Sequence, residues 1–186
     1  MPANLPPPQA GKFPSECKEA EFVTLNFRGG RCNQINGRDV SPLQAMQLAN
    51  EIGGRNGLGI SKAADGKELF ESPGMALLAS GLKFVYEEVF DKATGDIFKL
   101  YSRQVSTALY NGQYAEPPAQ SCLMAIRHLA SAADGLVELE LHSGEAIFLR
   151  LQCGGTVKHR GGTGFLELEH DDVFTPGNGS FSDVQW

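Results

Sequence analysis

Three carboxylates lie close together in a polar segment near the middle of the chain: Asp65, Glu68 and Glu71. A carboxylate with a raised pKa can act as a general base, and Lys62 or Lys67 beside them can pair with a carboxylate substrate. The alternative interpretation is a solvated loop that ends in Glu71 at a helix N-terminus, where the helix dipole favours a negative charge. Both interpretations stay open from the sequence.

Tyrosine and histidine side chains further along the chain add candidate proton donors. Tyr114 and His128 complete the predicted catalytic set, and a local hydrogen bond is the alternative role of His128. Tyr110 is a candidate ligand donor beside the same turn as Tyr114, with packing in the core or at an interface as its alternative role. The histidines show no His-x-x-x-His spacing, so no metal site is predicted. No Gly-x-Ser-x-Gly motif indicates a serine nucleophile.

A turn that contains two glycines, Arg55-Asn56-Gly57-Leu58-Gly59, follows a predicted helix. The backbone N–H groups of such a turn can face an anion, so Arg55, Asn56, Gly57 and Gly59 are predicted to bind substrate. The alternative is a helix stop followed by a tight turn, which needs no ligand.

Composition excludes several classes of protein. The 186 residues are 41% hydrophobic and 20% charged, with a formal net charge of −6, which is ordinary for one globular domain and argues against binding nucleic acid or anionic membranes. No apolar run approaches the roughly 20 residues of a membrane helix, and no secretory signal is visible. The scattered cysteines predict no disulfide framework, and with these features they predict a cytoplasmic protein.

Helix signals occur four times between the turns. Ser41 and Pro42 begin a helix that ends at Gly53-Gly54, with Gln44 completing a capping box. Further helices are predicted over residues 75–90, from about Asp96 to 109, and from 117 to about 134, because their apolar residues recur at helical spacing. Residues 55–70 are predicted to be an exposed loop.

Strand signals flank this helical region. Residues 22–27 predict a strand, followed by a short one through residues 34–35. Residues 137–141 and 147–151 alternate in polarity around a turn and predict a β-hairpin with one buried face, and residues 165–168 are a further candidate strand. The predicted fold class is α+β, with helices packed on an antiparallel sheet. Residues 1–20 form a predicted proline-rich arm, and residues 21–186 a single domain.

Several motifs, taken in order, resemble the C-terminal domain of argininosuccinate synthase. They are Ile35-Asn36-Gly37, Ser41-Pro42, residues 49–59, Glu71-Ser72-Pro73-Gly74 and residues 109–114 with Pro117, and the likeness covers about residues 21–155. The resemblance implies an α+β fold and a homodimer or higher homo-oligomer. Each motif alone is weak, but their order makes the combination specific.

Departures from the family pattern shape the functional prediction. The family's nucleotide-binding phosphate loop, Ser-Gly-Gly-x-Asp, has no counterpart here, so the chain alone is not expected to make argininosuccinate and no cofactor is expected. The family's citrulline-binding segment resembles residues 60–70, which are shorter; Phe70 stands at a tyrosine position and has no hydroxyl. Phe70 and Ser72 are therefore predicted to line a remodelled pocket in place of the citrulline site.

Two functional hypotheses follow. In the first, the chain binds a small metabolite and transforms it without ATP, by cyclisation, elimination or isomerisation, in a specialised biosynthetic pathway. The carboxylates, tyrosines and histidine above support only acid–base chemistry of this kind. In the alternative, the chain is a non-catalytic homo-oligomeric partner or pseudoenzyme module that complements a separate subunit.

Overall fold

The computed structural model describes residues 19–62 and 69–160. Its main feature is a six-stranded antiparallel sheet in the order β3-β2-β1-β6-β7-β8. The strands are β1 (Glu21–Arg28), β2 (Arg31–Ile35), β3 (Arg38–Asp39), β6 (Gly135–His142), β7 (Glu145–Cys153) and β8 (Thr156–His159). The predicted α+β class is confirmed. Residues 1–18 of the predicted arm, which was expected over 1–20, and the candidate strand at 165–168 lie outside the described residues.

The centre of the sheet joins two strands that are far apart in the sequence. In β1 and β6, Val23 pairs with Leu139 and Leu25 with Val137, and all four side chains are buried. Alternate residues of a strand point to opposite faces, so these apolar residues line one face of the sheet. That face forms the core of the molecule.

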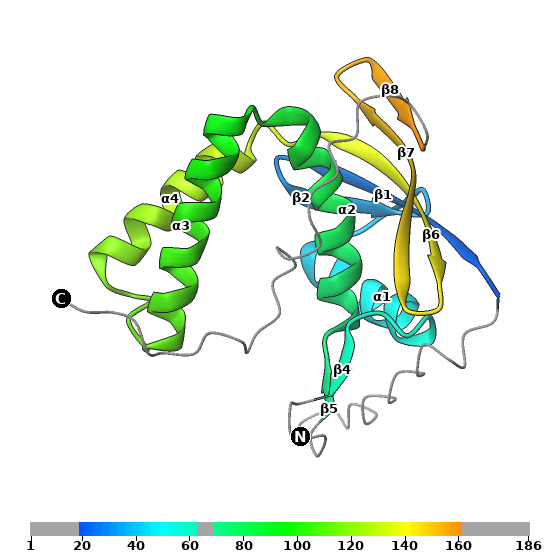
Figure 1. Ribbon diagram of the computed structural model, residues 1–186, viewed down its shortest axis with the longest axis horizontal. Helices are drawn as coiled ribbons and strands as arrows, with labels where there is room; N and C mark the ends of the chain where they lie inside the picture. Colours follow the sequence, from blue (N-terminus) through cyan, green and yellow to red (C-terminus); the bar gives the residue numbers. More distant parts are fainter. Residues whose placement is uncertain (1–18, 63–68, 161–186) are drawn as a thin grey trace.

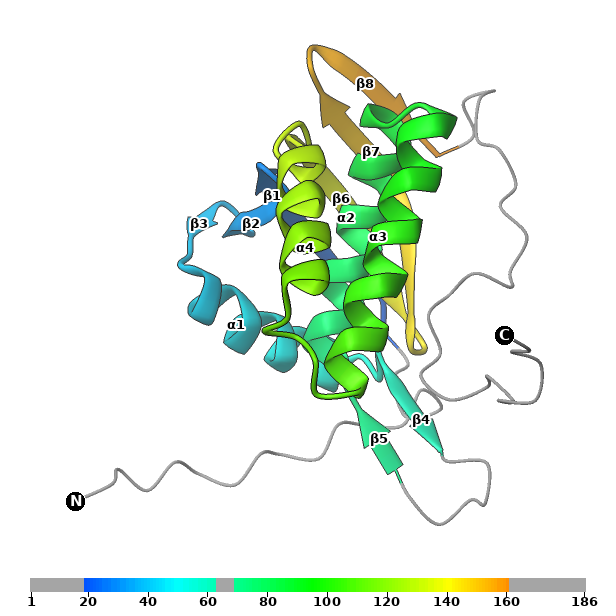
Figure 2. The same cartoon turned by 90° about the vertical axis from the view of Figure 1, so that its left-hand side faces the viewer.

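Two helices cover this face, α1 (Pro42–Arg55) and α2 (Pro73–Val89) (Figures 1 and 2). The capping box predicted for α1 is present, with Gln44 N donating to Ser41 Oγ at 3.4 Å and Ser41 N to Gln44 Oε1 at 2.9 Å. Helix α1 buries Ala45, Ala49 and Ile52 against the sheet. Burial of this stripe, added to the cap, accounts for a helix of this length.

Glycines set how closely α1 and α2 cross. A Cβ on Gly53 would lie 2.5 Å from the carbonyl oxygen of Pro73, which is closer than real Cβ contacts. On the facing helix, Gly74 N donates to Asn50 Oδ1 at 2.8 Å, and a Cβ on Gly74 would overlap that amide. The two helices therefore touch backbone to backbone where the sequence places the glycine motifs.

A short ribbon, β4 (Ile60–Lys62) and β5 (Leu69–Glu71), projects from the junction of α1 and α2 (Figure 1). The prediction of an exposed loop over residues 55–70 is wrong at these strands, which pair Ile60 with Glu71. Strands of three residues carry too little alternation to be recognised from sequence, and their pairing depends on the helices that hold their ends.

The remaining helices form a hairpin, α3 (Lys92–Tyr110) and α4 (Pro117–Ala130), that stands beside the sheet (Figures 1 and 2). Helix α3 starts four residues before the predicted Asp96, because Asp91 caps it by accepting from Thr94 N at 2.7 Å. The base of the hairpin is held by Gly30 N, which donates to Ala133 O at 2.9 Å. Helix α3 buries none of its residues, and α4 buries only Ala119 and Ala130.

Candidate functional site

Most of the residues predicted to bind substrate come together where α1 ends and β4–β5 begins. The backbone closes this junction, since Ser72 N donates to Gly59 O at 3.0 Å and Ile60 pairs with Glu71. The predicted residues that meet here are Arg55, Asn56, Gly57, Gly59, Phe70, Glu71 and Ser72. Asp65 and Glu68 lie outside the described residues.

Arg55 and Asn56 are held by Glu21, a residue that the sequence did not single out. Arg55 Nε donates to Glu21 Oε2 at 2.8 Å, and the second guanidinium contact reaches Glu21 Oε1. Asn56 is 4% exposed, and its Nδ2 donates both to Glu21 Oε2 at 2.7 Å and to Ile52 O at 2.8 Å. The Arg55 guanidinium lowers the pKa of Glu21, against the opposing effect of partial burial. These contacts fasten the end of α1 to the start of β1.

The glycine turn itself has the geometry of a helix stop. Asn56 N and Leu58 N both donate to Gly53 O, at 3.2 and 2.9 Å, and Gly57 N donates to Gly54 O at 3.3 Å. Three consecutive amides are therefore used by the last carbonyls of α1, as at many helix ends. This arrangement agrees with the alternative interpretation of the motif and leaves these amides engaged within the protein.

Glu71 and Ser72 are exposed at the same junction. Ser72 occupies the N-cap position of α2, but its hydroxyl makes no capping hydrogen bond. A carboxylate and a hydroxyl beside each other are groups that can accept and donate protons to a polar ligand. The junction thus keeps two of the predicted polar side chains at its surface.

Tyr110, Tyr114 and His128 lie on the helical hairpin. Tyr110 ends α3 with 85% of its surface exposed, and Tyr114 lies in the turn to α4, where its carbonyl accepts from Gln120 Nε2 at 2.6 Å. His128 is exposed in the last turn of α4. Since a helix rises about 1.5 Å per residue, Tyr114 and His128 are separated by the length of α4, on the order of 17 Å. Tyr114 and His128 are therefore too far apart to act on the same atom of a small substrate.

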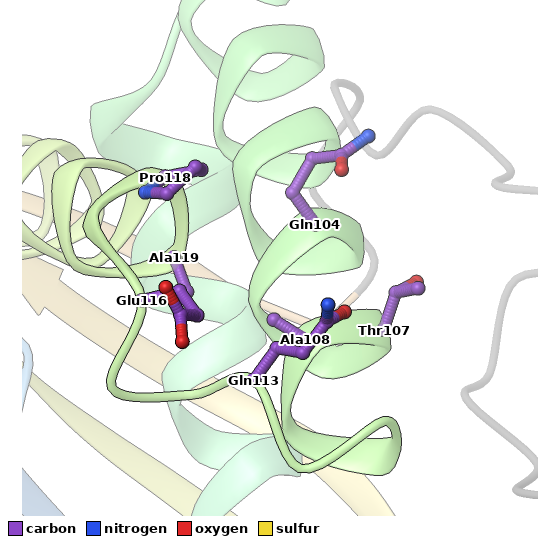
Figure 3. A pocket seen from close by; sticks show the side chains of 7 residues that line it. All are labelled: Gln104, Thr107, Ala108, Gln113, Glu116, Pro118 and Ala119. Atoms are coloured by element: carbon purple, nitrogen blue, oxygen red, sulfur yellow. The ribbon is translucent and has the colours of Figure 1, made fainter.

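A hollow of about 200 Å³ lies between α3 and the start of α4 (Figure 3). None of the predicted site residues lines it. Its lining surface is mostly apolar and comes from Gln104, Thr107, Ala108, Gln113, Glu116, Pro118 and Ala119. No sequence pattern marks this hollow, because it depends on how the two helices separate toward the tip of the hairpin.

Residues 19–62 and 69–160 contain no group of three His, Cys, Asp or Glu side chains placed to hold a metal ion. Within the same ranges, no helix is both long enough and apolar enough to cross a membrane.

Comparison with known proteins confirms the resemblance. Argininosuccinate synthases of Shewanella denitrificans and Shewanella frigidimarina are 27% and 26% identical to the chain over 163 residues, which is 84% of this chain and 39% of each relative. That of Shewanella woodyi is 28% identical over 133 residues, 68% of this chain and 33% of the relative. The chain thus spans well under half the length of these relatives. The family model described as the arginosuccinate synthase C-terminal domain matches residues 9–153, and the chain belongs to that family.

Proposed function

We propose that this chain is a homo-oligomeric assembly module of the argininosuccinate synthase C-terminal domain family, in which copies of the chain bind one another through the α3–α4 hairpin. One observation carries the proposal: the hairpin exposes large apolar side chains. Their exposed fractions are 46% for Ile97, 54% for Leu100, 62% for Leu109, 85% for Tyr110, 39% for Tyr114 and 63% for Met124. Exposed large apolar residues on two neighbouring helices are typical of interaction sites.

The distribution of apolar residues around α3 explains why α4 does not cover all of its apolar surface. Phe98, Tyr101 and Val105 are half-buried, while Ile97 and Leu100 on the adjacent strip of the helix surface are exposed. The apolar arc of α3 is therefore wider than a single neighbouring helix can bury. A helix hydrophobic over such an arc is stable when a second surface packs on it.

The exposed apolar area, summed over all faces of the hairpin, is comparable with one side of a specific interface. If a fully exposed large side chain presents about 200 Å², as aromatic residues do, the fractions above amount to roughly 700 Å² per chain. A standard protein interface buries about 800 Å² per partner. The hairpin thus offers close to one side of such an interface before any polar rim is counted.

The mass of the chain in solution tests this proposal. Analytical ultracentrifugation of the full chain from 1 to 200 μM, as rough limits, should give a mass above the 20.0 kDa of one chain. The double variant I97K/L100K should sediment as a single chain, because two charges cannot be buried in an apolar interface. Glu145→Arg, on the β6–β7 hairpin, is the control and should associate like the native chain. Association unchanged in I97K/L100K contradicts the proposal.

A second candidate function is the binding of a small metabolite, with acid–base chemistry that needs no ATP. It is favoured because the predicted residues meet at the α1–β4–β5 junction. Glu71 and Ser72 are both exposed there, and the Ser72 hydroxyl makes no capping hydrogen bond to α2. In this proposal Glu71 is the base, and Ser72 and the backbone near Gly59 orient the ligand. The two candidates use different surfaces, so each is tested separately.

Thermal shift with citrulline, arginine, aspartate and ATP as probes tests the second candidate. A ligand at about a hundred times its dissociation constant stabilises the folded chain by about 2.7 kcal/mol. A shift with an amino acid, absent with ATP and lost in Glu71→Gln, is the expected result. Glu145→Gln is the matched control, which should keep the shift. No shift with any of the amino acids, or a shift that survives Glu71→Gln, contradicts this site.

A further inference from the structure

The strand β8 forms one end of the six-stranded sheet (Figures 1 and 2). All four of its residues, Thr156 to His159, are exposed. Within the described ranges 19–62 and 69–160, β8 pairs with β7 on one edge and with no strand on the other. An edge of this kind carries N–H and C=O groups that can pair with a further strand. The other end of the sheet, β3, has only two residues and offers fewer such groups.

The hydrogen bonds to β7 identify which backbone groups of β8 lie on the outer edge. Arg160 N donates to Leu149 O at 2.9 Å, so the backbone of Arg160 points towards β7. In an antiparallel pair, alternate residues of a strand direct their N–H and C=O groups to the same side. Lys158 therefore also points towards β7, whereas Val157 and His159 present two donors and two acceptors on the outer edge.

The side chains of β8 divide between the two faces of the sheet. Lys158 pairs with the buried Leu151 and forms an ion pair with Glu88 of α2, so it lies on the face that α2 covers. Val157 and His159 lie on the opposite face, because successive side chains of a strand alternate. With Arg160, the strand ends in three consecutive basic residues, which favour an acidic partner.

The chain that follows β8 has the complementary charge. Residues 161–186 lie outside the described residues and contain five acidic residues and no lysine or arginine. Near their start, Leu166 and Leu168 alternate with Glu167 and Glu169, which is the pattern of a strand with one buried face. A short tether gives such a segment an effective concentration on the order of millimolar at the edge from which it leaves.

The family comparison does not extend to this part of the chain. The match to the family model ends at residue 153, before β8 begins. Family membership therefore carries no information on what the outer edge of β8 binds, and the residues of this chain have to identify the partner.

We infer that residues 165–169 of the same chain bind the outer edge of β8 as a further antiparallel strand. His159 pairs with Phe165 and Val157 with Glu167. Residues 160–164 then form a five-residue loop that contains three glycines, and hairpin loops of this length are common. The strand uses the outward N–H and C=O groups of β8 and leaves its bonds to β7 intact.

This register separates the apolar and acidic side chains of the segment. Leu166 and Leu168 fall on the face that α2 covers, where apolar side chains are buried against the core. Glu167 falls on the opposite face, diagonal to His159, within reach of a charge pair between neighbouring strands. The register thus follows from the polarity of the two faces as well as from the length of the loop.

Hydrogen exchange of single amides, measured by nuclear magnetic resonance on the full chain, tests the inference. The amides of Val157 and His159 should exchange at least about tenfold more slowly than unpaired amides, because they donate to the added strand. Glu167→Pro removes an N–H from that strand and should abolish this protection. The amide of Lys158, which points towards β7, should change less.

Ser182→Pro is the matched control, since it adds a proline to the same segment outside residues 165–169. It should leave the exchange of Val157 and His159 as in the native chain. Unprotected amides at Val157 and His159 in the native chain contradict the inference, as does protection that survives Glu167→Pro.

Two further measurements identify the occupant and the register. Protection by a segment of the same chain is independent of protein concentration, so protection that appears only as the concentration rises shows that another molecule covers the edge and contradicts the inference. In the proposed register, the α protons of Lys158 and Leu166 face each other at a pair without hydrogen bonds and should show a nuclear Overhauser effect. A contact of Lys158 with a different residue of the segment contradicts this register.

The inference involves neither the α3–α4 hairpin nor the α1–β4–β5 junction. Its outcome is therefore independent of both proposed functions, and I97K/L100K should keep the protection of Val157 and His159. Loss of that protection in I97K/L100K would show that the edge is covered through assembly and would overturn the inference.

Discussion

Glu21 connects parts of the chain that are distant in sequence. Its carboxylate accepts from Arg55 and Asn56 at the end of α1, while Asn56 O accepts from Gly144 N in the turn between β6 and β7. The Arg55 guanidinium lowers the pKa of Glu21. At the scale of single residues, Arg55 and Asn56, which were predicted to bind substrate, instead form hydrogen bonds that connect α1 to the sheet.

Replacing this carboxylate should reduce stability in a pH-dependent way. Glu21→Gln should lower the free energy of unfolding by about 1–2 kcal/mol at pH 7, since charged hydrogen bonds to Arg55 and Asn56 are lost from a partly exposed site. A pKa lowered in the folded state gives stability that is present above the unfolded-state pKa, about 4.3, and lost as pH falls through the lower folded value. The difference in unfolding free energy between Glu21→Gln and the native chain should therefore shrink as the pH falls from the unfolded-state pKa of about 4.3 towards the lower folded-state pKa.

Urea unfolding measured at several pH values between 7 and 3, as rough limits, tests this expectation. Glu19→Gln, two residues earlier in an exposed position, is the control and should change stability little at any pH. A Glu21→Gln difference that stays constant or grows on acidification would show that the Glu21–Arg55 pair does not stabilise the fold.

Cys32 should react slowly with thiol reagents. Burial raises its pKa to about 11, against the smaller effect of the hydrogen bond from its thiol to Gln34 O. Because the thiolate is the reactive form, alkylation by iodoacetamide at pH 8 should be at least about tenfold slower than for a small free thiol. Mass spectrometry of peptides over a time course measures the rate. Labelling at the rate of a free thiol contradicts the burial of this side chain.

At the scale of elements, the packing of α1 against α2 depends most on the size of the residues where the two helices cross. Gly53 lies against the backbone of Pro73, and Gly74 against the side chain of Asn50. Both contacts involve atoms that are themselves held, by the helix start at Pro73 and by the Gly74 N–H to Asn50 hydrogen bond. The glycine motifs therefore fix the distance between the two helices that cover the sheet.

A methyl group added at this crossing should lower the free energy of unfolding, whereas one added on an open helix face should not. Gly53→Ala should destabilise the fold by about 1–3 kcal/mol, since the helices must move apart. Gly95→Ala, in α3, is the matched control: nothing lies within 4 Å of its Cβ position. It should stabilise by about 0.5–1 kcal/mol, because alanine favours a helix over glycine. Thermal unfolding of both variants measures the difference, and equal effects contradict the close crossing.

At the scale of the whole molecule, a sheet covered by two helices carries a hairpin attached at its base. Tyr86 and Phe90 near the end of α2 contact Phe98 of α3, with ring centroids 4.8 and 5.3 Å apart. The core residues of β1 and β6 are buried, whereas α3 has no buried residues. Stability is therefore distributed unevenly, with the sheet as the most protected part of the described structure.

Hydrogen exchange should report this difference. In the I97K/L100K variant, which should be a single chain, amides of α3 and α4 should exchange faster than those of β1 and β6, since fewer buried contacts oppose local opening. In the associated native chain, α3 should be slower than in the variant, while β1 and β6 stay the same. Mass spectrometry of exchanged peptides measures both. Equal protection of α3 in the two proteins contradicts its place in the interface.

The elements with strong local signals were predictable. Ser41, Pro42 and Gln44 identify the start of α1, and the alternation over residues 137–151 identifies β6 and β7. The ordered motifs identified the family, which the comparisons confirm. The strands β3, β4, β5 and β8, of two to four residues, were missed, because segments this short show no period and are formed by what they pair with.

The sequence by itself determined the family, the helix starts and the polarity of the central strands, since caps and periodic patterns act within a few residues of the chain. Only the tertiary structure decided that Glu21 holds Arg55 across 34 positions, that Gly53 meets Pro73, and that Ile97 and Leu100 remain exposed. Each of these depends on distant segments being brought together or kept apart. Chain folding sets such distances through the packing of the whole core, and no local pattern encodes them.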